Sequence, residues 1–113
     1  MKILVLVASS LLIALWTQYA SAADGKALYR ASCIACHGEK GQGAIPGVPD
    51  LARSGRMSKT DQELVDSILK GYRTKGSPMA MPPKGGNPKL TEEDARAIVV
   101  YLRSIAKSPK KTP

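Results

Sequence analysis

The sequence is short of aromatic residues: it contains no Phe, and Phe, Trp and Tyr together make up 4% of its 113 residues. Aromatic side chains bury the largest apolar areas, so a small domain with few of them has difficulty filling its own core. A chain of this length has room for one small domain, which excludes a multidomain enzyme. Its hydrophobic fraction of 43% excludes a disordered chain. The composition therefore leaves open what fills the core.

Cysteine, histidine and acidic residues are also scarce. The sequence has 2 Cys and 1 His, too few Cys for a disulfide-dense scaffold and too few ligands for a structural zinc site built from nitrogen and sulfur alone. There are 9 acidic residues against 17 Lys and Arg, which gives a formal net charge of +8. This balance excludes an acidic solvating tail and favours partners with acidic surfaces.

The first 22 residues carry the features of a secretory signal peptide. A positive charge at Lys2 precedes a short apolar run, and residues 20–22 (Ala-Ser-Ala) form a small-x-small cleavage site. An uncleaved membrane anchor is the alternative, but the run is interrupted at Ser9-Ser10 and is shorter than the ~20 apolar residues that span a bilayer. We expect a signal peptide over residues 1–22, cleaved after Ala22, and export of the rest.

The exported chain is expected to form one all-α domain over residues 23–106, followed by a flexible basic tail over residues 107–113. Apolar residues recur at helical spacing, and Gly-rich and Pro-rich loops separate the helical segments. The segments that begin at Thr60 and Thr91 each open with a Thr followed three residues later by an acidic residue, which predicts a helix N-cap. No alternating pattern indicates a strand. The predicted helices cover residues 24–35, 60–71 and 91–105.

Long loops in a small helical domain need something to pack around, and the segment Cys33-Ile-Ala-Cys36-His37 indicates what it is. C-x-x-C-H is the attachment motif of c-type haem. Two thiols one helical turn apart reach the two vinyl groups on one edge of the porphyrin. The adjacent His37 then lies beneath the iron as its first axial ligand. The motif predicts one covalently bound haem c in the chain.

Three other interpretations of the two cysteines are weaker. A redox-active C-x-x-C needs a βαβ context, which the sequence lacks. A zinc site would need acidic residues to complete its ligand set. A disulfide between Cys33 and Cys36 would close a very small loop and stabilise little. None of the three explains why His37 follows Cys36 directly.

The second axial ligand is expected from the loop before the last helix, where Met79 and Met81 compete. The two are two residues apart, so in extended backbone they lie on one face, although only one sulfur can bind. We favour Met81, because the prolines at 82–83 bias it towards an extended conformation and stiffen the segment that holds its weakly binding sulfur. Met79 is then a gap-filling side chain and Met57 an apolar contact.

Several short motifs follow one another in a fixed order along the exported chain. They are Gly25-x-x-x-Tyr29, Cys33-x-x-Cys36-His37-Gly38, Gly41-x-Gly43, Pro49-Asp-Leu51, Met81-Pro82 and a terminal helix with Tyr101. This order resembles the class I cytochrome c family, and the Met-Pro-Pro-Lys-Gly segment resembles its small bacterial monohaem members. The resemblance implies a class I cytochrome c fold, with three or more helices and long loops wrapped around one covalently bound haem.

The resemblance also implies roles for individual residues. The carbonyl of Pro49 would accept a hydrogen bond from the Nδ1–H of His37 and leave Nε2 for iron. Gly25 and Tyr29 would lie where the first helix crosses the last. Family members often carry a Trp or Tyr that hydrogen-bonds a haem propionate, and the exported chain has no Trp. Its candidate replacements are Arg53, Arg56, Tyr72 and Arg73. The expected lining of the haem pocket is Leu51, Ile68, Leu69 and Leu102.

With His37 and Met81 filling both axial positions, no site remains for a substrate. The expected function is therefore one-electron transfer between Fe(III) and Fe(II) in the periplasm, by a carrier rather than an enzyme. Two alternatives remain open. One is a haem c subunit of a periplasmic dehydrogenase that oxidises, for instance, an inorganic sulfur compound or an alcohol. The other is a ligand sensor or weak peroxidase with an open sixth position.

Basic residues in or beside the loops around the haem predict redox proteins with acidic surfaces as partners. They are Lys40, Arg53, Arg56, Lys70, Arg73, Lys75, Lys84 and Lys89. A solvated surface that keeps an exported protein soluble is the plain alternative. Nucleic-acid binding and stable membrane insertion after signal cleavage are not expected, and the protein is expected to be a monomer.

Overall fold

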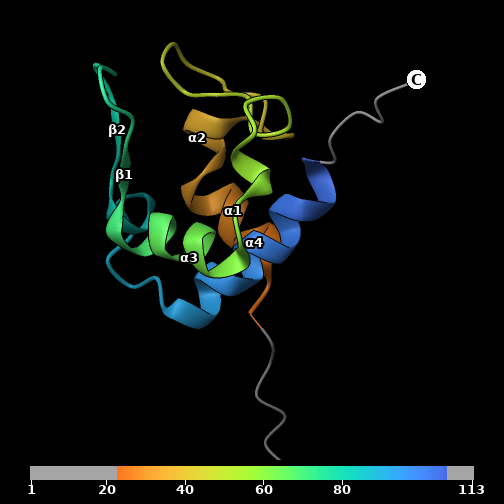
Figure 1. Cartoon of the computed structure of the whole chain (residues 1–113). Coiled ribbons are helices and arrows are strands. Elements are labelled where there is room, and N and C mark those ends of the chain that lie inside the picture. Colours follow the sequence, from red (N-terminus) through yellow and green to blue (C-terminus); the bar gives the residue numbers. More distant parts are fainter. Residues whose placement is uncertain (1–22, 107–113) are drawn as a thin grey trace, which may run out of the picture.

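A computed structural model describes residues 23–106, so the expected signal peptide and basic tail lie outside the described residues. Short helices and turns make up most of the fold, and a small strand pair lies at one edge (Figure 1). The elements are α1 (Gly25–Ser32), α2 (Ile34–His37), η1 (Arg56–Ser58), α3 (Asp61–Lys70), β1 (Tyr72–Arg73), β2 (Ala80–Met81), η2 (Pro83–Gly86) and α4 (Glu92–Ile105). The predicted all-α class is confirmed. Within residues 23–106, no helix is long and apolar enough to cross a membrane.

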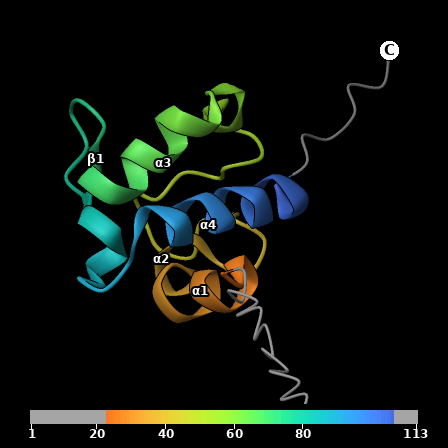
Figure 2. The same cartoon turned by 90° about the horizontal axis from the view of Figure 1, so that it is seen from below.

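Helix α4 lies between α1 and α3 and carries the centre of the core (Figure 2). Both capping boxes that the sequence predicts are formed. At α4 the Thr91 hydroxyl accepts from the Asp94 amide at 3.1 Å, and the Asp94 carboxylate accepts from the Thr91 amide at 2.9 Å. At α3 the Glu63 carboxylate accepts from the Thr60 amide at 2.7 Å. Each cap satisfies amides that the first helical turn leaves unpaired.

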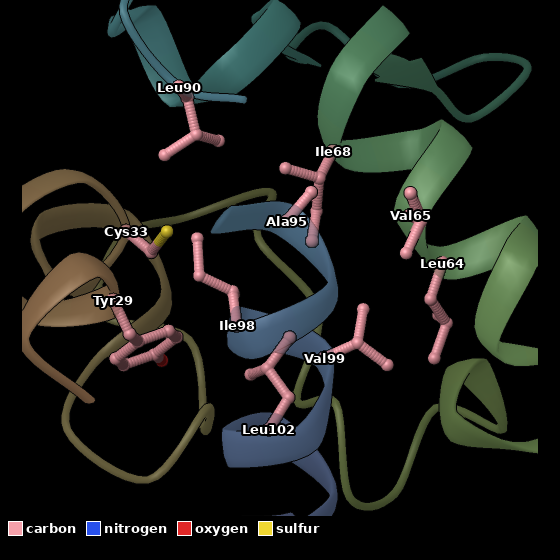
Figure 3. Close-up of a cluster of buried hydrophobic side chains, with 10 residues drawn as sticks. All are labelled: Tyr29, Cys33, Leu64, Val65, Ile68, Leu90, Ala95, Ile98, Val99 and Leu102. Carbon is pink, nitrogen blue, oxygen red and sulfur yellow. The ribbon is translucent and has the colours of Figure 1, made fainter. Parts of the chain in front are cut away.

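The core is almost entirely aliphatic, and it forms where α1, α3 and α4 meet (Figure 3). Helix α4 turns one face to α1 and another to α3, and the Leu90 side chain closes one end. The sulfur of Cys33 points into this cluster from the end of α1 (Figure 3). The buried members are Tyr29, Cys33, Leu64, Val65, Ile68, Leu90, Ala95, Ile98, Val99 and Leu102.

The crossing of α1 and α4 depends on Gly25. A Cβ atom at this position would lie 2.1 Å from the Ala97 carbonyl oxygen, so any other residue would force the helices apart. One turn later the Tyr29 ring, 1% exposed, packs at 5.4 Å from the Tyr101 ring. Its hydroxyl donates to the Gly38 carbonyl at 2.5 Å, and burial raises the pKa of Tyr29 to about 12. The expected crossing is therefore confirmed.

The structure corrects two expectations about local structure. The first predicted helix is not continuous, because Cys33 (φ −120°, ψ −33°) separates α1 from α2. The loop after α3 contains an antiparallel strand pair, in which Tyr72 lies opposite Met81 and Arg73 opposite Ala80. Each strand has only two residues, too few for an alternating pattern to be visible in the sequence. The pair fixes the methionine segment against the end of α3.

Candidate functional site

A cavity of about 180 Å³ lies between α1–α2, α3, α4 and the strand pair. Side chains from nearly every element line it, and no Asp or Glu is among them. Its walls bring together both cysteines, the single histidine and three methionines. Six of the site residues predicted from the sequence line this cavity: Cys33, Cys36, His37, Pro49, Leu51 and Met81, with Met79 as the competing sulfur.

The two cysteines have different surroundings. Both thiols are free, so they do not form the small-loop disulfide considered above. Cys33 is buried at the break between α1 and α2, and burial raises the pKa of its thiol to about 11. Cys36 is exposed and lies in α2 beside His37. The Cys33 carbonyl accepts hydrogen bonds from the backbone amides of Cys36 and His37, at 3.2 and 3.0 Å, which keep the three residues in one turn.

The His37 ring is half-buried in the cavity wall, and its Nδ1 atom is buried without a hydrogen-bond partner. The hydrogen bond expected from Nδ1 to the Pro49 carbonyl is therefore not formed. The carbonyls of Val48 and Pro49 instead lie against Gly43, 2.5 and 3.5 Å from where its Cβ would be. Burial lowers the pKa of His37, so the imidazole is neutral at pH 7. A neutral imidazole can bind a metal ion.

These features fit a haem. His37 supplies an imidazole to a mostly apolar cavity that also contains two free thiols and methionine sulfurs. Haem iron takes imidazole and thioether ligands, and the thiols match the two attachment points of a c-type haem.

Met79 and Met81 both line the cavity, as the extended backbone predicts for residues two apart. Met81 is half-buried in β2, and its carbonyl lies 2.6 Å from where a Cβ of Gly71 would be. Because Gly71 has φ +79°, glycine is needed there both for the turn and for this close approach. Met79 is 39% exposed and lies next to Gly47. The two methionines thus differ in burial and in how firmly their backbone is held.

Most of the expected apolar wall is present. Leu51, Ile68 and Leu102 line the cavity as predicted, and Met57 joins them as an apolar contact. Leu69 does not line it. Because Leu69 follows Ile68 directly on α3, its side chain points about 100° away and packs against the core instead.

Two of the four candidate propionate-binding residues line the cavity. Arg56 and Tyr72 do, whereas Arg53 and Arg73 do not. Lys59 also lines it, although the sequence reasoning did not select it; its spacing of three residues from Arg56 was the available signal. Interactions with Lys59 and, to a smaller extent, with Arg56 lower the pKa of the Tyr72 hydroxyl.

Residues 20–102 match the family described as "Cytochrome C oxidase, cbb3-type, subunit III". The chain belongs to the c-type cytochromes. Cytochrome c-555 of Chlorobaculum thiosulfatiphilum is 44% identical to this cytochrome over 82 residues, which cover 72% of this chain and 92% of that protein. The predicted family is confirmed, and the chain is a small class I c-type cytochrome.

Solved structures of other cytochromes have a similar fold. The KustC0563 c-type cytochrome has a TM-score of 0.57 and 28% sequence identity, with 73% of this chain and 96% of that chain covered. A chain from the crystal structure of an electron transfer complex of nitrite reductase with cytochrome c has a TM-score of 0.56 and 27% identity, with 74% and 95% covered. The class I cytochrome c fold predicted from the sequence is confirmed.

Family membership establishes the cofactor and the general function. This cytochrome carries covalently attached haem c and acts as an electron carrier rather than an enzyme. Both predictions made from the sequence are thereby confirmed.

Proposed function

We propose that this cytochrome is an exported one-electron carrier, in which Cys33 and Cys36 attach the haem and His37 and Met81 are its axial ligands. The observation that carries the proposal is that these four side chains line one mostly apolar cavity. Export is supported by the signal-peptide features of residues 1–22, and we place the protein in the periplasm.

Attachment through two thioethers requires two free thiols within reach of one porphyrin edge. Cys33 and Cys36 would each hold the haem by adding their S–H across one vinyl double bond, with the sulfur on one carbon and the hydrogen on the other. The break at Cys33 directs this thiol into the core, while Cys36 lies one turn further on at the exposed side. The protein thereby holds the two sulfurs three residues apart on a fixed stretch of backbone.

The two methionines are distinguished by their backbone. A thioether is a weak ligand, so its position should be fixed before it binds. Met81 is held by pairing with Tyr72 and by the close approach of Gly71, and it is half-buried. Met79 lies outside β2 and is partly exposed to solvent. These differences favour Met81 as the ligand.

The bound haem supplies one-electron chemistry between Fe(III) and Fe(II). The chain determines what else can happen at the iron. His37 and Met81 would fill both axial positions and leave no place for an external substrate, and Leu51, Ile68 and Leu102 would form an apolar wall against the haem. A thioether ligand in an apolar pocket raises the reduction potential relative to a haem with two histidine ligands.

We further propose that the partners are redox proteins with acidic surfaces. The excess of Lys and Arg over Asp and Glu supports this, as does the likeness to a cytochrome solved in complex with nitrite reductase. Arg73 and Lys75 are exposed in the hairpin beside the cavity, and neither makes an ion pair among residues 23–106. Arg53 and Lys70, by contrast, pair with acidic residues.

Steering by these charges has a measurable consequence. Hexacyanoferrate(III) is an anionic oxidant. We expect its rate of oxidation of the reduced cytochrome to fall roughly tenfold or more from low to high ionic strength, because salt screens the attraction. A cationic cobalt phenanthroline oxidant should react faster as salt is added. Stopped-flow absorbance measures both rates.

The variants Arg73→Gln and Lys75→Gln should weaken this salt dependence more than Lys26→Gln, which removes the same charge from α1 outside the cavity wall. Equal behaviour of all three variants, or rates independent of salt, would contradict steering at the hairpin.

Size-exclusion chromatography of the native protein tests whether it is a free monomeric carrier; co-elution with a dehydrogenase would favour the subunit alternative.

A further inference from the structure

Two positive side chains converge on one ring at the cavity wall. The Arg56 guanidinium lies 4.9 Å from the centre of the Tyr72 ring, and the Lys59 ammonium lies 4.4 Å from it. Arg56 also donates from Nη2 to the Thr74 hydroxyl at 2.9 Å. All four residues line the haem cavity. The cluster is therefore built into the site and does not lie on a separate surface.

The cluster lacks a matching negative charge. No Asp or Glu lines the cavity, and neither Arg56 nor Lys59 makes an ion pair within residues 23–106. Lys59 helps to lower the pKa of Glu63. The Glu63 carboxylate, however, already accepts hydrogen bonds from Thr60 at the start of α3. Two cations held over one ring repel each other unless an anion lies between or beside them.

Arg103 fixes the segment that carries both cations. From α4 its Nη1 donates to the Met57 carbonyl at 2.9 Å and its Nη2 to the Lys59 carbonyl at 2.8 Å, while Nε pairs with Asp61 at 2.6 Å. One planar guanidinium thus connects η1, the residue before the α3 cap and α3 itself. Arg103 is not among the residues that line the cavity, so any effect on it acts through the segment from Arg56 to Lys59.

We propose that Arg56 and Lys59 bind a carboxylate of the haem at the Tyr72 side of the cavity, and that Arg103 is the positioning residue for this pair. The inference rests on the proposed haem site and extends it. A porphyrin attached through its vinyl groups still carries two propionate carboxylates. They supply the anion that the cavity lining lacks, and a guanidinium is well suited to bind a carboxylate.

The test uses the holo-cytochrome with the haem labelled isotopically, from 5-aminolaevulinic acid labelled at its carboxyl carbon. Redox-difference infrared spectra then report the haem carboxylates directly. We expect Arg56→Gln and Lys59→Gln to shift the labelled carboxylate band and to lower the reduction potential, because a carboxylate without its cation favours Fe(III). Arg53→Gln and Arg73→Gln remove the same charge outside the cavity lining and should leave the band in place.

Arg103→Gln is expected to reproduce part of the band shift, whereas Arg96→Gln, on the same helix, should not. A band that does not move in Arg56→Gln or Lys59→Gln would overturn the proposal. Arg56→Lys keeps the charge and should retain most of the wild-type potential, which separates loss of the carboxylate contact from misfolding. The sulfur-to-iron charge-transfer band of the wild-type protein reports Met81 ligation independently, so failure of this inference is distinguishable from failure of the proposed ligand set.

Discussion

The double variant Cys33→Ala, Cys36→Ala is expected to have no covalent haem and no cooperatively folded domain. The double variant has no thiol left to form a thioether, and the porphyrin is the large apolar body that the walls of the cavity would contact. A domain of this size obtains only ~3–5 kcal/mol from its own core, which is too little to close an apolar cavity at its centre. Intact-mass measurement after acid–acetone extraction tests attachment, and circular dichroism during heating tests folding.

Two single variants and one control complete this experiment. Cys33→Ala and Cys36→Ala should each keep one thioether and resist haem extraction in part. Ser67→Ala removes one polar atom from the same cavity wall and should keep the haem fully attached. A compact double variant that melts cooperatively without haem would show that the protein core does not depend on the cofactor.

The variant Met81→Ala is expected to lose the weak sulfur-to-iron charge-transfer band of the oxidised protein. It should also lower the reduction potential by on the order of 0.1 V or more, because the thioether stabilises Fe(II) relative to Fe(III). Met81 is the methionine held in the strand pair and against Gly71. Visible spectroscopy and a potentiometric titration measure the two effects.

Met79→Ala is the matched control, since Met79 lines the same cavity two residues away but lies outside the strand. We expect it to retain the band and to change the potential little. Met57→Ala should behave in the same way, because Met57 is an apolar contact in the cavity wall. Loss of the band in Met79→Ala, with Met81→Ala unaffected, would reverse the ligand assignment.

The features predicted correctly from the sequence depend on neighbouring residues. The capping boxes at Thr60 and Thr91 lie within four residues and form as expected. The haem motif is equally local, because Cys33, Cys36 and His37 occupy one turn. Gly25 was predictable from family resemblance, and the Ala97 carbonyl beside it explains why a side chain is excluded.

The features that sequence reasoning missed depend on residues far apart in the chain. Lys59 faces Tyr72 only because the segment before α3 and the strand after it meet at the cavity. Arg103 reaches Lys59 across 44 positions, which no periodicity reveals. The break at Cys33 interrupts a helical pattern that continues in sequence. Long-range packing, and not local propensity, decides these positions.

The central claim is that the chain's own side chains close both axial positions of a covalently bound haem. Visible spectra of the wild-type oxidised cytochrome, recorded before and after mixing with cyanide, test it most directly. We predict a low-spin spectrum with the sulfur-to-iron band, and slow cyanide binding limited by release of the methionine. A high-spin spectrum with fast cyanide binding would contradict the claim and would indicate an open site for an external ligand.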